Sequence, residues 1–476
     1  MLIQDSERRK SESMKIHFVG IGGEGMSGMA KLAISQGHEV TGSEIGLKHS
    51  LKELEGLGAK IFREHSRENV YGRELVVRSS GIPLTHIEIS AAIESGIDVV
   101  KRSQCLGKLL VDTKQRIIRI AGSYGKSTTT AMLGSILKTS GFDPTIIVGA
   151  NVPLFASHAV IGKGGYAIVE SCEFDRSFLD IPGFSSIITG IEPDHLDYYT
   201  GGLPEIVEAF IRFANQSDKK DGILVACTDN KNVRELFLPF YTGPVQTYGL
   251  NSGDWQAKIL ETKTSHGWND FVVTHRGVYF GEFRMPFPGV HYVQNALAAI
   301  VAASFIGVHR EDLICGIQSY KGVSRRYEKV VNQDDLKVID DYGHTPVEIA
   351  TVIRAAREEF PEGFLLCVPC LRQFHRTKQL RKEFASVLAT ADACVVAPIV
   401  SGLGDDKTTL NTITPEQLAS EIRLCGSNAF SGSTEEEVSD RVKEILLKTN
   451  RTPKIILAVG SGVSSGVIEH FKTYAR

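Results

Sequence analysis

Short apolar runs alternate with segments of helical spacing along most of the chain, and glycine or acidic turns separate them. This order is typical of parallel α/β folds, in which strand, turn and helix repeat. Strands are predicted at residues 15–19, 39–41, 75–77, 99–100, 116–121, 166–169, 185–191, 223–227, 336–339, 364–368, 393–397 and 455–459. Helices are predicted at residues 26–35, 87–95, 105–110, 128–139, 296–307 and 347–360. Residues 251–284 alternate polar and apolar side chains, which predicts an antiparallel insertion.

The predicted elements form three α/β units, which suits a chain of 476 residues. Residues 1–13 are polar and are predicted to be a disordered lead-in. A Rossmann-like domain is placed at residues 14–112, a central P-loop domain at 113–325 and a C-terminal Rossmann-like domain at 326–476. Residues 322–327 are predicted to be the hinge before the third domain.

Composition narrows the choice of partners and compartment. A net charge of −3 argues against a nucleic-acid surface. The most apolar stretch, residues 296–308, is too short to span a bilayer, and the N-terminus lacks the apolar core of a signal peptide. Eight cysteines scattered through apolar segments predict reduced, buried thiols in a cytoplasmic protein. Cys367 and Cys370 have redox or zinc spacing, but no second pair accompanies them, so a structural role is expected.

The strongest chemical signal is Gly122-Ser-Tyr-Gly-Lys-Ser127, which lies between a predicted strand and a predicted helix. Amides of a glycine turn at a helix N-terminus bind phosphate, Lys126 supplies a positive charge, and the Ser127 hydroxyl can ligate Mg²⁺. The loop is two residues shorter between its glycines than the common Walker form. ATP and Mg²⁺ are therefore predicted, and the alternative is a glycine turn that only caps a core helix.

A second glycine loop, Gly20-Ile-Gly-Gly-Glu-Gly25, follows the first predicted strand and precedes a helix. This context predicts binding of a nucleotide diphosphate, with Ser43 and Glu44 near the position where a ribose is held. NAD, FAD and UDP-sugars all fit such a loop. A nicotinamide oxidoreductase is the competing hypothesis, although it leaves the phosphate-binding loop at 122–127, called the cradle below, unexplained.

Acidic side chains follow two strands of the central unit. Glu170 ends the strand 166–169, with Glu173 and Asp175 just beyond it. Glu192, Asp194 and His195 follow the strand 185–191. Acids at strand ends of a P-loop domain can hold Mg²⁺, whereas the alternative is a pair of solvated turns. Histidine at such a corner is either a metal ligand or a hydrogen-bonded loop residue.

Polar residues also mark the edges of two later elements. Asn295 precedes the apolar helix at 296–307, where the local pattern favours a helix cap over an adenine contact. Asp341 and His344 follow the strand 336–339, at the sheet edge where α/β folds bind ligands.

These motifs, in this order, resemble the Mur ligase family, the ATP-dependent ligases that build the stem peptide of peptidoglycan. The resemblance runs from about residue 14 to the C-terminus. It rests on the cradle and on the segments GIGGEGMSGMA (20–30), EHSRENV (64–70), ESCEFDRSFL (170–179), IEPDHLDYY (191–199), HYVQNALAA (291–299), GVSRRYE (322–328) and DDYGHTP (340–346).

The resemblance implies a cytoplasmic enzyme, monomeric or homodimeric, that uses ATP and Mg²⁺ to join a free amino acid, expected to be L-alanine, to the carboxylate of UDP-N-acetylmuramate through an acyl phosphate. The implied UDP-sugar contacts are Gly20, Gly22, Gly23, Gly25, Met26, Ser43, His65 and Ser80. The implied ATP contacts are Gly122, Ser123, Tyr124, Gly125, Lys126, Ser127, Thr128, Asn295, Arg326 and Asp341. The implied metal ligands are Ser127, Glu170 and His195. The implied catalytic residues are Lys126, His195, Arg326 and His344, and the amino-acid contacts are His344, Arg372 and Arg376.

Three segments depart from the family pattern. The cradle GSYGKSTT stands where GTHGKTTT is usual, and ESCEFD stands for EADESD with one intermediate acid lost. CLRQFHRT at 370–377 stands for QPHRYTRT, so that Arg372 replaces a histidine and Gln373 an arginine, while Arg376 and Thr377 persist. The acceptor therefore stays open between alanine, serine, glycine, another amino acid and a peptide, as in the murein-peptide ligase branch. A nucleotide-binding homologue that has lost catalysis is the remaining alternative.

Overall fold

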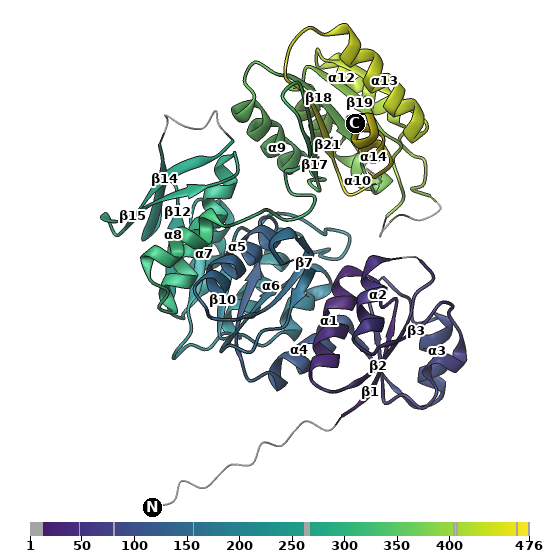
Figure 1. Ribbon diagram of the computed structural model, residues 1–476, viewed down its shortest axis with the longest axis vertical. Coiled ribbons are helices and arrows are strands. Elements are labelled where there is room, and N and C mark those ends of the chain that lie inside the picture. The colour runs from purple at the N-terminus through teal and green to yellow at the C-terminus, as the bar shows by residue number, and fades with distance from the viewer. Residues whose placement is uncertain are drawn as a thin grey trace, which may run out of the picture.

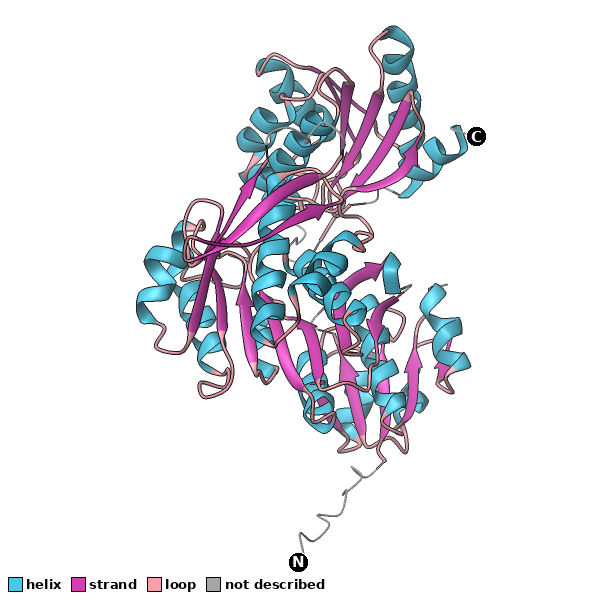
Figure 2. Ribbon diagram, turned by 60° about the vertical axis from the view of Figure 1, so that its left-hand side comes forward, coloured by secondary structure: helices cyan, strands magenta, loops and turns pink. Residues whose placement is uncertain are grey.

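The computed structural model describes residues 13–46, 48–79, 81–155, 157–260, 267–402, 405, 408–462 and 465–474, so the predicted lead-in at 1–13 lies almost wholly outside the described residues. The chain forms three sheets in succession, each flanked by helices (Figures 1 and 2). The predicted α/β class with three domains is confirmed.

The N-terminal sheet has five parallel strands in the order β3-β2-β1-β4-β5. Its strands are β1 (Lys15–Val19), β2 (Glu39–Ser43), β3 (Lys60–Phe62), β4 (Leu75–Arg78) and β5 (Asp98–Lys101). Its helices are α1 (Glu24–Ser35), α2 (His49–Gly56), η1 (Arg67–Val70), α3 (Ile87–Glu94) and α4 (Arg102–Asp112). Strand order reverses beside β1, and this places the first glycine loop at the point where such sheets bind nucleotides.

The middle sheet has ten strands in the order β15-β14-β13-β12-β11-β10-β6-β9-β7-β8. They are β6 (Arg116–Ala121), β7 (Thr145–Val152), β8 (Ser157–Val160), β9 (Tyr166–Glu170), β10 (Ser185–Ile188), β11 (Leu224–Cys227), β12 (Val245–Gly249), β13 (Trp255–Ile259), β14 (Asn269–His275) and β15 (Val278–Met285). The helices are α5 (Lys126–Thr139), α6 (Leu203–Asn215), α7 (Val290–Phe305) and α8 (Arg310–Gln318), with short turns η2 (Pro153–Phe155), η3 (Phe174–Asp180), η4 (Val233–Phe237) and η5 (Leu238–Phe240). Strands β13, β14 and β15 pair antiparallel, which confirms the predicted insertion.

The C-terminal sheet has six strands in the order β16-β17-β21-β18-β19-β20. They are β16 (Glu328–Asn332), β17 (Leu336–Asp341), β18 (Phe364–Pro369), β19 (Ala393–Val396), β20 (Asn428–Ser431) and β21 (Lys454–Val459). The helices are α9 (Pro346–Glu359), α10 (Phe374–Gln379), α11 (Arg381–Leu388), α12 (Pro415–Leu424), α13 (Glu435–Lys448) and α14 (Ser465–Tyr474). Only β16 is antiparallel, and β21, the last strand in sequence, lies between β17 and β18.

The strands predicted from apolar runs are all present, with ends within three residues of the prediction. Several short strands at sheet edges, such as β3 and β20, were not predicted, because they carry partly exposed side chains and lack a continuous apolar run. Helix α6 was not predicted either, although the buried Ile206, Phe210 and Phe213 repeat at helical spacing there.

The apolar helix α7 starts earlier than predicted. It begins at Val290, after Gly289 with φ +89°, so Asn295 lies inside the helix. The capping role that the local pattern favoured for Asn295 is therefore wrong. The rest of α7 is buried against the middle sheet, as its composition predicts.

Both boundaries between domains are packed. Met29 and Ala30 of α1 share an apolar cluster with Ala159 and Val169 of the middle sheet. Lys101 and Asp175 form an ion pair of 2.7 Å across the same boundary. At the other boundary, the cluster that surrounds α7 continues into the C-terminal domain through residues such as Ile349.

Within the described residues, none of the helices is both long and apolar enough to cross a bilayer. All eight cysteines are free, but Cys315 and Cys425 are exposed, which corrects the expectation that all would be buried. Cys367 and Cys370 are buried, and burial raises the pKa of Cys370 to about 12. Because redox and metal-binding cysteines need an accessible thiolate, this environment fits the structural role.

Candidate active site

The glycine turn at 122–125 joins β6 to α5, and its backbone conformation requires glycine at two positions. Gly122 has φ +140° and Gly125 has φ +80°. A β-carbon at Gly122 would overlap the Thr189 hydroxyl, and one at Gly125 would overlap Asn295 Oδ1. The turn therefore leaves the N-terminus of α5 open and brings α7 into contact with it.

A cavity of about 360 Å³ opens between this turn, the first turns of α7 and the first turns of α9. Most of the predicted ATP contacts line it: Ser123, Tyr124, Gly125, Lys126, Ser127, Thr128, Asn295, Arg326 and Asp341. Glu170 lines it as well, whereas Gly122 contributes its carbonyl, which accepts a hydrogen bond of 2.5 Å from Lys126 Nζ. A single space thus collects residues that are distant in the sequence.

Lys126 is held by a carboxylate rather than by solvent. Its ammonium lies 3.1 Å from Glu173 Oε2, and both side chains are largely buried. Burial alone would lower the pKa of Lys126, but the negative charges of Glu173 and Glu170 raise it above its ordinary value. The lysine is therefore charged at neutral pH and can attract phosphate oxygens.

Ser127 and Glu170 form a pair of oxygen donors at the N-terminus of α5. Ser127 donates to Glu170 Oε1 over 3.0 Å, and Glu170 Oε2 accepts from the Gly149 amide over 2.6 Å. Hydroxyl and carboxylate oxygens are the ligands that Mg²⁺ prefers. The donor set therefore fits a magnesium ion bound to a nucleotide.

His195 belongs to a second, adjacent group of donors. Glu173, Asp194 and His195 each place a donor atom within 4.8 Å of the others. His195 has φ +53°, and its ring contacts Phe174 at 5.0 Å between centroids. Glu173 connects this donor group with the cradle, because it also pairs with Lys126.

The sequence pattern treated Glu170, Glu173 and Asp175 alike, and the structure separates them. Glu170 and Glu173 face the cradle, whereas Asp175 pairs with Lys101 at the boundary with the N-terminal domain. Asp194 was predicted only as one of the acids that could hold Mg²⁺ beside His195, at the end of an apolar strand, and not as an individual site residue.

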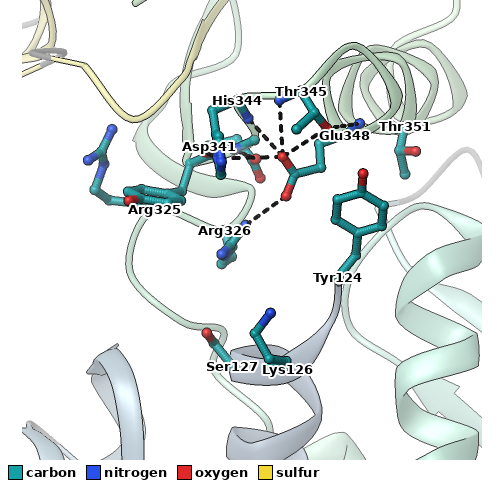
Figure 3. A network of polar contacts seen from close by, with 12 residues as sticks. Tyr124, Lys126, Ser127, Arg325, Arg326, Asp341, His344, Thr345, Glu348 and Thr351 are labelled. Atoms are coloured by element: carbon teal, nitrogen blue, oxygen red, sulfur yellow. Dashed lines mark hydrogen bonds and ion pairs between the residues drawn. The ribbon is translucent and has the colours of Figure 1, made fainter. Parts of the chain in front are cut away.

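The C-terminal domain contributes a polar network that faces the cradle (Figure 3). Glu348 in the first turn of α9 accepts a hydrogen bond from the His344 amide over 2.9 Å and lies 3.9 Å from Arg326 Nη1. Asp341 accepts from the Tyr327 and Gly343 amides. Burial raises the pKa of Asp341 to about 6, although the charge of Arg326 opposes this.

Tyr124 stands where the family pattern has a histidine. Its carbonyl accepts a hydrogen bond from Thr189, and its ring lies on the side of the cavity that faces α9 (Figure 3). Burial raises the pKa of Tyr124 to about 12, while the Thr345 side chain lowers it by hydrogen bonding. The phenol is therefore neutral, and it approaches the start of α9 from the cradle side.

Other residues of the cavity were not predicted, among them Asp229, His291 and Glu348. Burial and the charges of Arg326 and Arg354 lower the pKa of His291 to about 4, so its ring is neutral at pH 7. His291 opens the segment HYVQNALAA but was given no role, and no motif marks Asp229 or Glu348, because the proximity of these residues depends on how the elements around the cavity pack.

The first glycine loop follows β1 as predicted. Gly20 has φ +74°, and a β-carbon at Gly22 would lie 2.9 Å from Glu44 Oε2. Gly23 precedes α1, and a β-carbon at Gly25, in its first turn, would overlap the Arg102 guanidinium. The loop therefore presents backbone at the helix N-terminus, with little room for side chains.

Two predicted sugar-nucleotide contacts are buried instead. Met26 packs in the core of the N-terminal domain, so its side chain is not available as a contact. Its amide donates to the Gly23 carbonyl. Ser43 is fully buried and donates to Glu88 over 2.7 Å. Ser80 lies outside the described residues.

His65 is tied to the same buried carboxylate and remains partly exposed. Its Nδ1 lies 2.9 Å from Glu88 Oε2 and 3.0 Å from Ser43 Oγ. The Ser43 carbonyl in turn accepts the amide of Gly20. One network therefore connects His65 with the glycine loop.

The predicted amino-acid contacts lie at different places. Arg376 in α10 reaches the middle domain, where its Nη2 lies 3.7 Å from Asp194 Oδ1. His344 lies near this pair, since the charge of Arg376 lowers its pKa and the charge of Asp194 raises it. Arg372 is exposed and donates to the Ser401 carbonyl over 3.0 Å. The structure thus brings Arg376 and His344 close to Asp194, whereas Arg372 contacts the Ser401 carbonyl.

Comparison with known proteins agrees with this arrangement. Profiles described as "Mur ligase family, catalytic domain", "Mur ligase middle domain" and "Mur ligase, glutamate ligase domain" match residues 15–113, 120–303 and 325–462. The chain belongs to the Mur ligase family, a class of ATP-dependent ligases. This membership excludes the nicotinamide oxidoreductase that the first glycine loop alone would allow.

Similar proteins are named more specifically. UDP-N-acetylmuramate–L-alanine ligase of Caldanaerobacter subterraneus subsp. tengcongensis is 33% identical over 458 residues, which cover 96% of this chain and 97% of that protein. The enzyme of the same name from Geobacter sulfurreducens is 34% identical over 450 residues, 94% and 95% of the two chains. The crystal structure of the Thermotoga maritima UDP-N-acetylmuramate–alanine ligase MurC superposes with a TM-score of 0.81 at 26% identity and covers 97% of this chain and all of that one. A murein peptide ligase from Psychrobacter arcticus has a TM-score of 0.67 at 22% identity, over 97% and 98% of the chains, and shares the fold.

Proposed function

We infer that this chain is an ATP-dependent ligase that joins L-alanine to the carboxylate of UDP-N-acetylmuramate in peptidoglycan precursor synthesis. The observation that carries the inference is the cavity where the cradle, the Ser127–Glu170 pair and Arg326 of the C-terminal domain meet. Relatives named UDP-N-acetylmuramate–L-alanine ligase match the chain over almost its whole length at 33–34% identity.

The chemistry proceeds in two steps. A carboxylate oxygen of UDP-N-acetylmuramate attacks the γ-phosphorus of ATP, the bond to the β–γ bridging oxygen breaks, and ADP leaves. The amine of the amino acid then attacks the carbonyl carbon of the acyl phosphate, loses a proton and expels inorganic phosphate. The first step brings two anions together, and the second develops negative charge on the carbonyl oxygen and on the leaving phosphate, so the site must supply positive charge.

Residues of the cavity meet this need. Lys126 is charged and lies at the α5 N-terminus, where it can contact the β- and γ-phosphates. Ser127, Glu170 and His195 would hold Mg²⁺, which supplies charge neutralisation at the phosphates when bound. Arg326 and Asp341 reach the same cavity from the far side, and Asn295 contacts the cradle at Gly125.

The nucleotide-sugar is assigned to the N-terminal domain. Its glycine loop opens at the N-terminus of α1, and this favours a diphosphate. Contacts with Ser43 and Glu88 hold His65 beside this loop. Its side chain stays partly exposed, so it can contact the substrate. Because both nucleotide substrates belong to the cytoplasm and all cysteines are free, we place the enzyme there, as a monomer or homodimer.

The altered segment at 370–377 favours testing a second acceptor class. Arg372 replaces the family's histidine and donates to the Ser401 carbonyl, so this segment departs from the family pattern at a predicted amino-acid contact. Serine, glycine or the stem tripeptide of a murein-peptide ligase are the alternatives to alanine. The remaining alternative to this function is a nucleotide-binding homologue that has lost catalysis.

Phosphate release tests these alternatives directly. The full chain is incubated with ATP, Mg²⁺, UDP-N-acetylmuramate and each of L-alanine, L-serine, glycine and the tripeptide, and each component is omitted in turn. We expect release only when all are present, with L-alanine giving the highest kcat/KM. Lys126→Met is expected to lower kcat by ~10³-fold while UDP-N-acetylmuramate still binds. Absence of turnover with every acceptor would refute the proposed function.

A further inference from the structure

Two histidines and one carboxylate meet in the N-terminal domain. His65 follows β3, whereas His86 and Glu88 lie at the start of α3. Each of the three side chains offers a ligand atom, and these atoms lie within 4.8 Å of one another. The fold therefore gathers two imidazoles and a carboxylate from separate segments at one place.

The distances between these side chains fit a small tetrahedral ion. His65 Nδ1 lies 2.9 Å from Glu88 Oε2, and His86 Nδ1 lies 4.0 Å from the same oxygen. Zinc binds nitrogen and oxygen at ~2.0–2.2 Å, which puts the ligand atoms of a tetrahedral site about 3.3 Å apart. The two observed distances bracket this value. The imidazole rings meet edge to face with their centroids 4.6 Å apart, so both border the same small space.

Hydrogen bonds fix the carboxylate in place. Glu88 Oε2 accepts from the Ser43 hydroxyl over 2.7 Å, and Glu88 Oε1 accepts from the Asn69 amide over 2.7 Å. His17 Nε2 lies 3.5 Å from Oε1. Partners of this kind orient the carboxylates that bind metals and favour their ionised form. Glu88 is thus positioned to serve as a ligand without further rearrangement of its own.

The two histidines leave the carboxylate open to solvent on one side. Glu88 is fully buried, whereas the His65 and His86 side chains are 24% and 20% exposed. His86 Nδ1 accepts the Glu88 amide over 3.3 Å, a long bond at the N-terminus of α3. An ion can therefore approach from the side of the histidines, take this lone pair and keep a water as its fourth ligand.

We propose that His65, His86 and Glu88 form a zinc site. Two imidazoles and one carboxylate are a ligand set that zinc accepts, whereas Mg²⁺ prefers oxygen ligands. The ion would replace the His65 N–H at Glu88 Oε2, and the neutral His65 ring would carry its proton on Nε2 instead. Ser43 and Asn69 would keep their hydrogen bonds to the carboxylate.

Zinc at this site would compete with the nucleotide-sugar. This part of the inference rests on the proposed function, which assigns His65 to UDP-N-acetylmuramate, whereas zinc binding itself does not. Ser43 joins the site to the first glycine loop, because its hydroxyl contacts Glu88 and its carbonyl accepts the amides of Gly20 and Ile21. An ion that engages His65 would remove a substrate contact from the edge of that loop.

A hydrogen-bonded network that binds no metal is the competing explanation. Such a network would hold the glycine loop in place and would show no affinity for zinc beyond that of any surface histidine. The two explanations therefore differ in a quantity that can be measured without turnover.

Metal content is the first readout. The full chain, with the exposed Cys315 and Cys425 blocked by iodoacetamide, is dialysed against buffered Zn²⁺ in excess Mg²⁺, and its zinc is determined by mass spectrometry. We expect one equivalent in the wild type. Titration with Co²⁺ is expected to give the strong visible absorption of a tetrahedral complex. The variant His195→Asn removes the histidine of the other donor group and is expected to keep the equivalent.

The decisive variants are His86→Asn and His65→Gln. Asparagine is a favourable helix cap, so His86→Asn removes a ligand and preserves the start of α3. Each change is expected to weaken zinc binding by ~100-fold or more, since losing a residue that only hydrogen-bonds a ligand already costs ~10–100-fold. His309→Asn is the matched control, because His309 is an exposed histidine at the N-terminus of α8. It is expected to leave zinc binding unchanged.

Phosphate release is the second readout. Zinc at about ten times its dissociation constant is expected to raise the apparent KM for UDP-N-acetylmuramate by ~10-fold, with kcat and the KM for ATP unchanged. His86→Asn is expected to turn over like the wild type in a zinc-selective chelator and to resist added zinc. Inhibition that raises the KM for ATP, or that persists in His86→Asn, would overturn the competition.

The two readouts separate the two possible failures. A wild type that turns over but retains no zinc, or zinc binding of equal strength in His86→Asn and His65→Gln, would refute the zinc site. A wild type that binds one zinc but releases no phosphate with any acceptor would refute the proposed function and support the site.

Discussion

Replacing Glu88 with glutamine is expected to destabilise the N-terminal domain in a pH-dependent manner. The carboxylate is fully buried and accepts hydrogen bonds from Ser43, Asn69 and His65, with His17 Nε2 at 3.5 Å. Burial alone would raise the pKa of Glu88, but the hydrogen bonds from His17, Asn69 and Ser43 lower it from 4.5 to about 2. The ionised form is therefore the one that the fold stabilises.

The size of the effect follows from this pKa. One pKa unit corresponds to about 1.4 kcal/mol, so the ionised Glu88 contributes ~3 kcal/mol to the free energy of unfolding. The folded-state pKa lies below the unfolded one, so this contribution is complete above about pH 4.5 and is lost as the pH falls toward 2. Glutamine cannot accept from all of these donors at once, and one of them is left unpaired.

Amide hydrogen exchange is the appropriate measurement, because a protein of three domains need not unfold in one step. Glu88→Gln is expected to lower the opening free energy of the β1 and β2 amides by ~2–3 kcal/mol at pH 7 and by much less near pH 3. Glu94→Gln, at the exposed end of the same helix, is the control and is expected to cost under ~0.5 kcal/mol. A loss below ~0.5 kcal/mol for Glu88→Gln at pH 7, or a loss that does not change with pH, would refute the reasoning.

Three further changes test the middle domain. Gly125→Ala is expected to cost ~1–2 kcal/mol in backbone strain and to weaken ATP binding in calorimetry through its clash with Asn295, whereas Gly141→Ala, with φ +77° and open space, is expected to cost stability only. Ser127→Ala is expected to raise the Mg²⁺ concentration for half-maximal rate by ~10-fold, with rescue by Ser127→Thr; an unchanged requirement would remove Ser127 as a ligand. Arg119→Met is expected to destabilise the domain by ~3 kcal/mol in urea titrations, because the buried guanidinium donates to the Ile181 and Phe213 carbonyls and to Ser186 and Ser217; a loss under ~1 kcal/mol would contradict this.

Features that depend on a few consecutive residues were predictable from the sequence. The cradle at 122–127 and the loop at 20–25 each combine an apolar strand, required glycines and a helix start within one short segment. The same holds for Glu170, since an acid at the end of a buried parallel strand must lie at the ligand edge of the sheet.

Contacts between distant segments were not predictable in this way. Asn295 faces Gly125 because α7 begins at Val290, and a starting point six residues later would have made it a cap. Asp194 meets Arg376 only because two separate domains pack there. Ser43 had the right sequence position for a ligand contact, but Glu88 on α3 holds it inside the domain.

The position of β21 has a consequence for how the protein is made. This strand is the last in the sequence, yet it forms the centre of its sheet between β17 and β18. While the ribosome is still adding residues before 454, β17 and β18 each expose an unpaired edge, and the strands that flank the future centre cannot join. The C-terminal sheet is therefore completed only after residues 454–459 have been added, and nascent chains that lack β21 expose the edges of β17 and β18 to aggregation and proteolysis.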